Sequence, residues 1–566
     1  MRKIRSVLVG LLALGLAAVA SAQFDGPAPL AWRWFQPTTT PPAGAPVVSG
    51  DTIYTAVGSR VYALDRSSGN KVWQFPAVDP IPGTFHAAPV LGGGLLVAAG
   101  DNKTIYAVDP VTGVQKWNAI VTQPVIGQPV ILDHYYVYAR SDNTIDALDL
   151  ATGAESWETS GGPYPIYSGL MGKLGAYKDS VLYFDQRNEL VSLNITNRKF
   201  DWTLKLTQVS ADMAPVVFGD RVYFTSGQYL IAVDASTGAA RWQIPTKQQL
   251  MFGPAVSATG VAIETQDGKV LAYSLDKAPL TKTPIDLGSY PEAQPSVCGT
   301  KFVFPTSNGA INLVDVTATQ PKQQILWSYI LRPMPSEVAG NGNNRTGSRG
   351  PGGGGGPGGG GGPGGGGGGG FGGQGPGGLG GQNQVQQVAL TSIPASGPAV
   401  LDGTTLIVPG KDGSLFAFDK DLGIDLTPPK VKMLFPNAGD QVAGVSPLEL
   451  DFKLEDDASG VDPSSVHVMI DGKPCEAVYK NDGTVKVSFS STGKNKYPSD
   501  GRKVITVKAK DWMGNEANVT FGLTIDNTLP PIALPGSSQG GRGGPGTGFP
   551  GGGGKGGGGG PGGGDG

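Results

Sequence analysis

The chain has 566 residues, and 43 Lys and Arg side chains nearly balance 46 Asp and Glu side chains, which leaves a net charge of -3. A nearly neutral chain offers no electrostatic reason to bind nucleic acid or an anionic membrane surface. The length allows two or more domains. Glycine accounts for 91 residues, well above the usual ~7%, and much of this excess falls in two tracts.

The first residues predict a signal peptide over residues 1–22. Three basic side chains precede an apolar run over residues 7–19, and a small-residue A-S-A cleavage site ends at Ala22. The apolar run is shorter than the ~20 residues of a membrane-spanning helix. No later segment is apolar enough to span a bilayer. We therefore expect a periplasmic or secreted protein without a transmembrane segment after cleavage.

A repeat then recurs about every forty residues. Four copies align without gaps: VYALDRSSGNKVW, IYAVDPVTGVQKW, IDALDLATGAESW and LIAVDASTGAARW, which end at Trp73, Trp117, Trp157 and Trp242. A fifth copy, LVSLNITNRKFDW, ends at Trp202 and varies the polar positions. Three degenerate copies begin near residues 253, 294 and 397, which brings the count to eight.

Each copy predicts a meander of short antiparallel strands, because runs of four to six residues alternate apolar and polar side chains between Asp, Gly, Asn and Pro turns. In the motif the Asp can bind backbone N–H groups of the following turn, the Gly supplies a positive φ, and the Trp packs between neighbouring sheets. The residues with these predicted structural roles are Asp65, Gly69, Trp73, Asp109, Gly113, Trp117, Asp149, Gly153, Trp157, Trp202, Asp234, Gly238, Trp242, Trp32 and Trp34.

Small sheets of this kind bury their faces when they repeat around a ring. The eighth copy lacks its Trp strand, whereas Trp32 and Trp34 form a Trp strand with no repeat before it. We therefore expect residues 31–36 to complete the last sheet and close the ring. The predicted fold is all-β: an eight-bladed β-propeller of four-stranded antiparallel sheets over residues 30–426, followed by an immunoglobulin-like β-sandwich.

The Ala-x-Asp-x-x-Thr-Gly-x-x-x-Trp repeat resembles the quinoprotein-type (PQQ-like) propeller repeat over roughly residues 30–425. That repeat occurs in quinone-dependent alcohol dehydrogenases and in non-enzymatic relatives such as the propeller lipoprotein of the outer-membrane assembly machine. The resemblance implies the fold, and fold alone does not fix function.

The sandwich is predicted over residues 428–527 from six alternating strand patterns separated by turns. Residues 456–462 and 509–515 resemble stretches of bacterial immunoglobulin-like modules, in which the second stretch is the turn between the last two strands. The glycine-rich tracts, residues 339–382 within the ring and residues 535–566 at the C-terminus, cannot bury a core, and we expect them to be disordered.

If this chain were a quinone dehydrogenase, the resemblance would imply an adjacent Cys pair. Cys298 and Cys475 are far apart in the sequence, and we expect them to be unpaired thiols. No Ca²⁺ ligand set, catalytic Asp or c-type haem motif can be placed on a matching stretch. We therefore predict no catalytic, cofactor-binding or metal-binding residues, and no cofactor.

Two weaker metal signals remain in the sequence. The histidines His86, His134 and His467 are isolated from one another. The acidic turn of Asp456, Asp457 and Asp462 leaves open a Ca²⁺ site made of carboxylate oxygens.

These observations favour a protein-binding or scaffolding module of the cell envelope, whose partner is a protein and not nucleic acid. A structural or adhesive surface protein is the first alternative, and a PQQ-dependent dehydrogenase is the second. The sequence leaves open the identity of the partner and the oligomeric state.

Overall fold

The computed structural model describes residues 24–36, 40–157, 164–165, 169–209, 214–333, 392–480 and 482–534. The predicted signal peptide and both glycine-rich tracts lie outside these residues. Within the described residues, no helix has the length and apolar character needed to cross a membrane.

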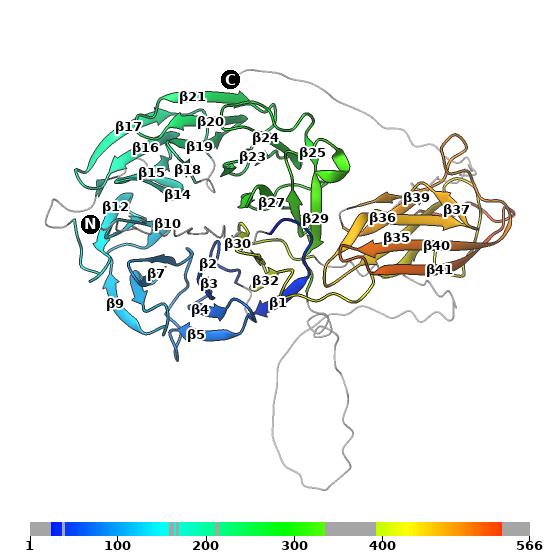
Figure 1. Cartoon of the computed structure of the whole chain (residues 1–566), viewed down its shortest axis with the longest axis horizontal. Helices are drawn as coiled ribbons and strands as arrows, with labels where there is room; N and C mark the ends of the chain where they lie inside the picture. Colours follow the sequence, from blue (N-terminus) through cyan, green and yellow to red (C-terminus); the bar gives the residue numbers. More distant parts are fainter. Residues whose placement is uncertain are drawn as a thin grey trace, which may run out of the picture.

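The residues between Leu30 and Phe418 form eight four-stranded antiparallel sheets in the described parts of the chain, and these sheets lie around a ring in Figure 1. We number them ring sheets 1 to 8. Ring sheet 1 contains β2 (Val47–Ser49), β3 (Thr52–Val57), β4 (Arg60–Asp65) and β5 (Lys71–Phe75), and ring sheet 2 contains β6 (Val90–Gly92), β7 (Leu95–Gly100), β8 (Thr104–Val108) and β9 (Gln115–Ile120). Ring sheet 3 contains β10 (Val125–Leu132), β11 (Tyr135–Arg140), β12 (Thr144–Asp149) and β13 (Tyr164–Pro165). Ring sheet 4 contains β14 (Leu170–Tyr177), β15 (Ser180–Asp185), β16 (Glu189–Asn194) and β17 (Lys199–Lys205).

Ring sheets 5 to 8 follow the same order, except that the last takes its outer strand from the N-terminus. Ring sheet 5 contains β18 (Val216–Phe218), β19 (Arg221–Ser226), β20 (Tyr229–Asp234) and β21 (Ala240–Pro245), and ring sheet 6 contains β22 (Ala255–Ser257), β23 (Gly260–Glu264), β24 (Lys269–Tyr273) and β25 (Ile285–Asp286). Ring sheet 7 contains β26 (Ser296–Cys298), β27 (Lys301–Pro305), β28 (Ala310–Val314) and β29 (Ile325–Ile330), with the short 3₁₀ helix η2 (Pro321–Gln323) before β29. Ring sheet 8 contains β30 (Val400–Asp402), β31 (Thr405–Pro409), β32 (Ser414–Phe418) and β1 (Leu30–Phe35).

The apolar core of the ring lies between the sheets. Eight clusters of buried side chains each join one ring sheet to the next, and the last of them joins ring sheet 8 back to ring sheet 1. A four-stranded sheet cannot bury both faces alone, so each sheet depends on its two neighbours. This arrangement confirms an all-β chain of four-stranded antiparallel sheets and is consistent with a propeller.

The predicted ring closure is confirmed by strand pairing. Strand β1 pairs antiparallel with β32, with Trp34 opposite Leu415 and Arg33 opposite Phe416. The Arg33 guanidinium donates to Asp412 Oδ2 at 2.6 Å and to the Arg332 carbonyl at 3.2 Å. The N-terminal strand is therefore bound to ring sheet 8 and to the end of ring sheet 7.

Within the described residues, the outer strand of ring sheet 3 differs from the one that the repeat predicts. The sequence places Trp157 at the end of an outer strand, but the outer strand of ring sheet 3 is the two-residue β13, farther along the chain. Trp157 is nevertheless buried, in the core cluster between ring sheets 3 and 4. The backbone before Trp157 pairs with β12 through the Leu148–Glu155 bridge and the bond from the Ser156 N–H to the Ala147 carbonyl, and residues 158–163 lie outside the described residues.

The C-terminal unit, from Lys430 to Ile525, consists of two sheets that enclose one core cluster. One sheet contains β33 (Lys430–Phe435), β35 (Glu449–Glu455), β39 (Thr484–Ser488) and β38 (Val478–Tyr479); the other contains β34 (Gln441–Val442), β41 (Glu516–Ile525), β40 (Gly501–Asp511), β36 (Val461–Ile470) and β37 (Lys473–Cys475). The six strands expected from the sequence are present, and residues 512–515 form the turn between β40 and β41. Figure 1 places this unit beside β29 and β1.

Candidate functional site

The Asp of the repeat accepts hydrogen bonds from the turn that follows it. Asp65 Oδ1 accepts hydrogen bonds from the backbone N–H groups of Ser67 and Ser68, at 3.1 and 2.9 Å. Hydrogen bonds from the side chains of the same two residues are the main reason that the pKa of Asp65 lies below its ordinary value. The equivalent bonds occur after Asp109, Asp149 and Asp234.

The Trp of one sheet binds the turn of the next sheet. Trp73 Nε1 donates to the Pro110 carbonyl at 3.0 Å, and the same kind of bond joins Trp32 to Arg66, Trp117 to Leu150, Trp202 to Ala235 and Trp242 to Leu275. We call this series the Trp contacts. Trp34 lies edge-on to Tyr62 of ring sheet 1, at a centroid distance of 5.0 Å. The repeated residues are therefore joints between sheets.

The Gly of each turn is required for space as well as for conformation. Gly113 has φ +70, and a Cβ at this position would lie 2.6 Å from the Trp73 ring. Gly69, Gly153 and Gly238 meet Trp32, Trp117 and Trp202 in the same way. Ring sheet 4 departs from this pattern, because Arg198 takes the Gly position and its guanidinium lies over the Trp157 ring at 5.1 Å.

Replacing Gly113 by Ala is expected to destabilise the ring. The positive φ costs about 1–2 kcal/mol for a residue with a Cβ, and displacing the Trp73 ring adds about 1–3 kcal/mol of overpacking. The control is Gly50→Ala, at φ +57 with no atom within 4 Å of the added Cβ. Chemical unfolding should show a larger loss in the free energy of unfolding for Gly113→Ala than for Gly50→Ala. Equal losses in the two variants would contradict the requirement for space as well as for backbone conformation at Gly113.

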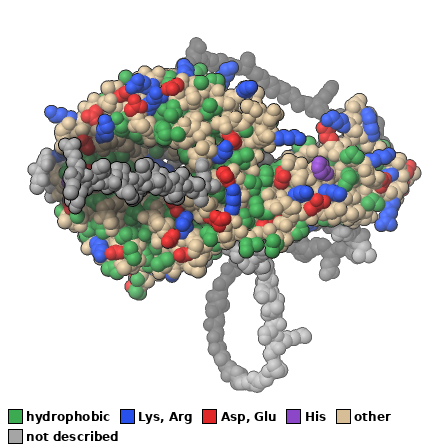
Figure 2. All heavy atoms as spheres, viewed as in Figure 1, with side chains coloured by type: hydrophobic (Ala, Val, Ile, Leu, Met, Phe, Trp, Pro, Cys, Tyr) green, Lys and Arg blue, Asp and Glu red, His purple; other side chains and the backbone are tan. Residues whose placement is uncertain are grey.

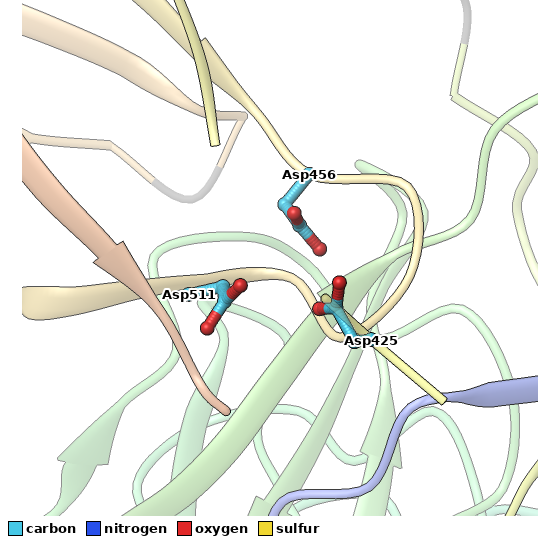
Figure 3. Close-up of side chains that lie close together, drawn as sticks. All are labelled: Asp425, Asp456 and Asp511. Atoms are coloured by element: carbon cyan, nitrogen blue, oxygen red, sulfur yellow. The ribbon is translucent and has the colours of Figure 1, made fainter. Parts of the chain in front are cut away.

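The described residues contain one group of three or more side chains that could hold a metal ion, which is formed by Asp425, Asp456 and Asp511. One carboxylate oxygen of each lies within 4.8 Å of the others. Figure 3 shows the three carboxylates pointing toward one another from three separate segments. Asp425 follows the last ring strand, whereas Asp456 and Asp511 come from two turns of the C-terminal unit. We call these three residues the carboxylate cluster.

The protein supplies hydrogen bonds to each member of the carboxylate cluster. Asp456 Oδ1 accepts the backbone N–H groups of residues 458–460, and Asp425 Oδ2 accepts the Ser459 hydroxyl at 2.6 Å. Asp511 accepts the backbone and side-chain N–H groups of Asn515. Burial raises the pKa of Asp456 and of Asp511, and the charge of Asp425 raises both further. Carboxylates so arranged could hold a hard cation such as Ca²⁺.

The structure corrects the acidic triad suggested by the sequence. Only Asp456 belongs to the carboxylate cluster. Asp457 lies beside Lys430 at 2.9 Å, and Asp462 accepts hydrogen bonds from Ser464 in its own turn. Sequence reasoning missed Asp425 and Asp511 because Asp456 is 31 residues from the first and 55 from the second, and the three segments meet only after both units have folded.

Replacing Asp425 by Asn is expected to relieve repulsion in the carboxylate cluster. The Asn carbonyl can still accept from Thr427, and its amide can donate to the Ser459 hydroxyl. A raised carboxyl pKa favours the folded state at low pH, and that stability is lost as pH rises through the folded-state pKa. The free energy of unfolding of Asp425→Asn should therefore exceed that of the parent by on the order of 1 kcal/mol at pH 8, and by less at pH 4.

Denaturation midpoints at the two pH values, measured in EDTA with Asp421→Asn as the exposed control, test this expectation. A gain that is equal at both pH values would contradict it.

The histidines are separate in the structure as in the sequence. His86 lies beside Asp101, with Nε2 and Oδ2 3.1 Å apart, and His134 lies beside Asp133. His467 is in β36, opposite Lys508. Cys298 and Cys475 are unpaired thiols, as expected. On the face shown in Figure 2, basic and acidic side chains are interspersed over the ring and the C-terminal unit.

Residues 57–278 match the family model described as "Outer membrane protein assembly factor BamB". This segment begins at the end of β3 and includes most of ring sheets 1 to 6. The match therefore places a PQQ-like, BamB-like repeat in the ring and leaves the C-terminal unit outside it.

Curated relatives match part of their own length. The outer membrane protein assembly factor BamB of Legionella pneumophila is 26% identical over 206 residues, which cover 33% of this chain and 50% of that protein. The serine/threonine-protein kinase AfsK of Streptomyces griseus is 26% identical over 284 residues, which cover 41% of this chain and 34% of the kinase. The chain thus spans half or less of the length of these two relatives. The crystal structure of BamB from Moraxella catarrhalis aligns with 69% of this chain and 97% of its own, at 14% identity and a TM-score of 0.47.

Proposed function

We propose that this chain is an exported, non-catalytic, eight-bladed propeller that binds other proteins of the cell envelope. In this proposal the C-terminal unit is an immunoglobulin-like sandwich, and the protein is periplasmic or secreted. The observation that carries the proposal is the match of residues 57–278, within the ring, to the family model of an outer membrane protein assembly factor.

The arrangement of the ring supports a binding role. Eight core clusters, each shared by two neighbouring sheets, hold the strands in fixed positions. Loops on such a scaffold can present a surface whose shape is set before the partner arrives, which lowers the entropy lost on binding. Curated relatives that are named as outer membrane protein assembly factors support a role of this kind in the cell envelope.

Crosslinking in intact cells tests the proposal. The full-length protein is crosslinked, purified under denaturing conditions and analysed by mass spectrometry, and the control is the same chain without residues 1–22. We expect one or a few envelope proteins to be enriched only with the complete chain. Equal enrichment with both chains, or recovery of the complete chain from the cytosol, would contradict the proposal.

A separate assay addresses catalysis. Purified protein is mixed with Ca²⁺ and PQQ, and dye reduction is followed with alcohols and sugars as substrates. We expect no bound chromophore and no dye reduction, whereas turnover of either substrate class would overturn the non-catalytic assignment.

A further inference from the structure

The series of Trp contacts changes partner at ring sheet 7. Trp327 of β29 is fully buried, and its Nε1 donates at 3.0 Å to the carbonyl of Ser459, which belongs to the C-terminal unit. In the other Trp contacts the acceptor belongs to the turn of the next ring sheet. The C-terminal unit therefore receives a side chain that elsewhere joins two ring sheets.

The turn that receives Trp327 has the sequence of a ring turn. Residues 456–460 read Asp-Asp-Ala-Ser-Gly, which matches the Asp-x-x-Ser-Gly of residues 65–69. Asp456 Oδ1 accepts the backbone N–H groups of Ala458 and Ser459, as Asp65 does in its own turn. Gly460 has φ +86, close to the +69 of Gly69. The two turns thus share Asp, Ser and Gly at the same positions, two backbone N–H groups bound to the Asp carboxylate, and a positive φ at the Gly.

The turn of ring sheet 8 is covered by another part of the chain. A Cβ on Gly423 would lie 2.8 Å from the Pro29 ring, and the Asp419 N–H donates to the Pro29 carbonyl. Phe24 lies edge-on to Trp327 at a centroid distance of 5.6 Å. The segment that precedes β1 therefore occupies the turn that would otherwise be available to Trp327.

Residues 456–460 also reach the strand that closes the ring. The Leu30 N–H at the start of β1 donates to the Ala458 carbonyl at 2.7 Å. The Tyr329 hydroxyl donates to the Asp457 carbonyl at 2.7 Å, and Trp512 Nε1 donates to the Ser328 carbonyl at 3.1 Å. Residues 456–460 thus contact the outer strands of ring sheets 7 and 8, on both sides of the joint between these two sheets.

Charged groups extend the same junction. The guanidinium of Arg332 faces Asp457 and Glu455, with N–O distances of 3.7 and 3.8 Å. The backbone carbonyl of Arg332 accepts a hydrogen bond from Arg33 of β1. Arg332 therefore connects the strand that closes the ring with the carboxylates of the C-terminal unit.

We propose that the C-terminal unit is an intramolecular lock on ring closure, in which residues 456–460 act as a substitute ring turn that holds β29 and β1 together. Because the lock contacts both strands, opening of β1 requires the C-terminal unit to detach or to move with it. The stability of the joint between ring sheets 7 and 8 is therefore coupled to the folding of the C-terminal unit.

Two matched variants in the full-length chain test the lock. Gly460→Ala places a Cβ 3.0 Å from the Ser328 carbonyl at the junction, whereas Gly472→Ala, at φ +74, adds a Cβ that meets nothing within 4 Å. Both variants strain the C-terminal unit, and only the first presses on the ring. Hydrogen exchange followed by mass spectrometry should show β1 and β29 exchanging about tenfold faster in Gly460→Ala alone, with β11 unchanged.

A third variant keeps the test informative if Gly460→Ala does not fold. Trp512→Phe removes the hydrogen bond to Ser328 and keeps an aromatic ring against the core cluster between ring sheets 7 and 8, which Trp512 contacts. We expect faster exchange in β1 and β29 for this variant also. The proposal is overturned if the exchange increase in Gly460→Ala or Trp512→Phe is confined to the C-terminal unit.

Discussion

Replacing Glu264 by Gln is expected to stabilise the protein at neutral pH and to make its stability less dependent on pH. Glu264 ends β23, and its side chain is 5% exposed. Both carboxylate oxygens are buried without a hydrogen-bond partner in the described residues. Because side chains alternate along a strand, Glu264 shares a face with Ala262, which belongs to the core between ring sheets 6 and 7.

Burial without a partner raises the pKa of Glu264 from 4.5 to about 9. The folded state therefore keeps the proton over a pH range in which the unfolded chain releases it. This carboxyl favours folding fully below pH 4.5, and its contribution falls as pH rises toward 9. The contribution of Glu264 to the free energy of unfolding falls by about 1.4 kcal/mol per pH unit, which amounts to about 3 kcal/mol at pH 7.

Glutamine has the same shape as glutamate and does not titrate, so this loss should disappear in Glu264→Gln. Denaturant midpoints of the variant and the parent should agree near pH 4.5 and separate progressively up to pH 8. Glu516→Gln, in the exposed part of β41, is the control and should follow the parent. A constant difference between Glu264→Gln and the parent across this range would show that the carboxyl is ionised or paired in the folded protein.

Deleting residues 31–36 is expected to be the most destabilising change outside the repeats. Trp32 and Trp34 are 9% and 8% exposed, and they belong to the core cluster between ring sheets 8 and 1. Removing a buried aromatic side chain costs about 3–5 kcal/mol, and the total stability of a domain is about 5–15 kcal/mol. The deletion also leaves β32 with an unpaired edge and Asp412 without Arg33.

We expect the shortened chain to open at the joint between ring sheets 8 and 1, which limited proteolysis and thermal unfolding would detect. Deletion of residues 535–566, outside the described residues, is the control and should leave the melting temperature unchanged. A melting temperature for the 31–36 deletion equal to that of the parent would show that β1 is not needed to close the ring.

Part of the repeated turn can be predicted from the sequence because the interactions within it are local. The hydrogen bonds that Asp65 accepts and the positive φ of Gly69 belong to one turn, whereas the contact of Gly69 with the Trp32 ring depends on the neighbouring sheet. The pairing of β1 with β32 is long-range, but the sequence indicates it. The eighth repeat lacks its Trp strand, and the Trp strand at the N-terminus has no repeat before it.

Other features, such as the burial of Trp157 and the junction with the C-terminal unit, depend on contacts between segments that are separate in the sequence. Trp157 is buried in the core between ring sheets 3 and 4, although the outer strand that the structure describes in ring sheet 3 is β13. The sequence contains a signal for the junction, since residues 456–460 repeat the pattern of residues 65–69. Nothing in that pattern states that Trp327 is the side chain it binds.

The sequence by itself determined the all-β class, the repeated turn and Trp residues, and the strand that closes the ring, because alternation, turn chemistry and a fixed spacing are properties of short segments. Only the tertiary structure decided the burial of Glu264, the meeting of Asp425 with Asp456 and Asp511, and the attachment of the C-terminal unit to β29 and β1. These features depend on surfaces that are far apart in the chain, and burial and charge interaction act only when such surfaces are brought into contact.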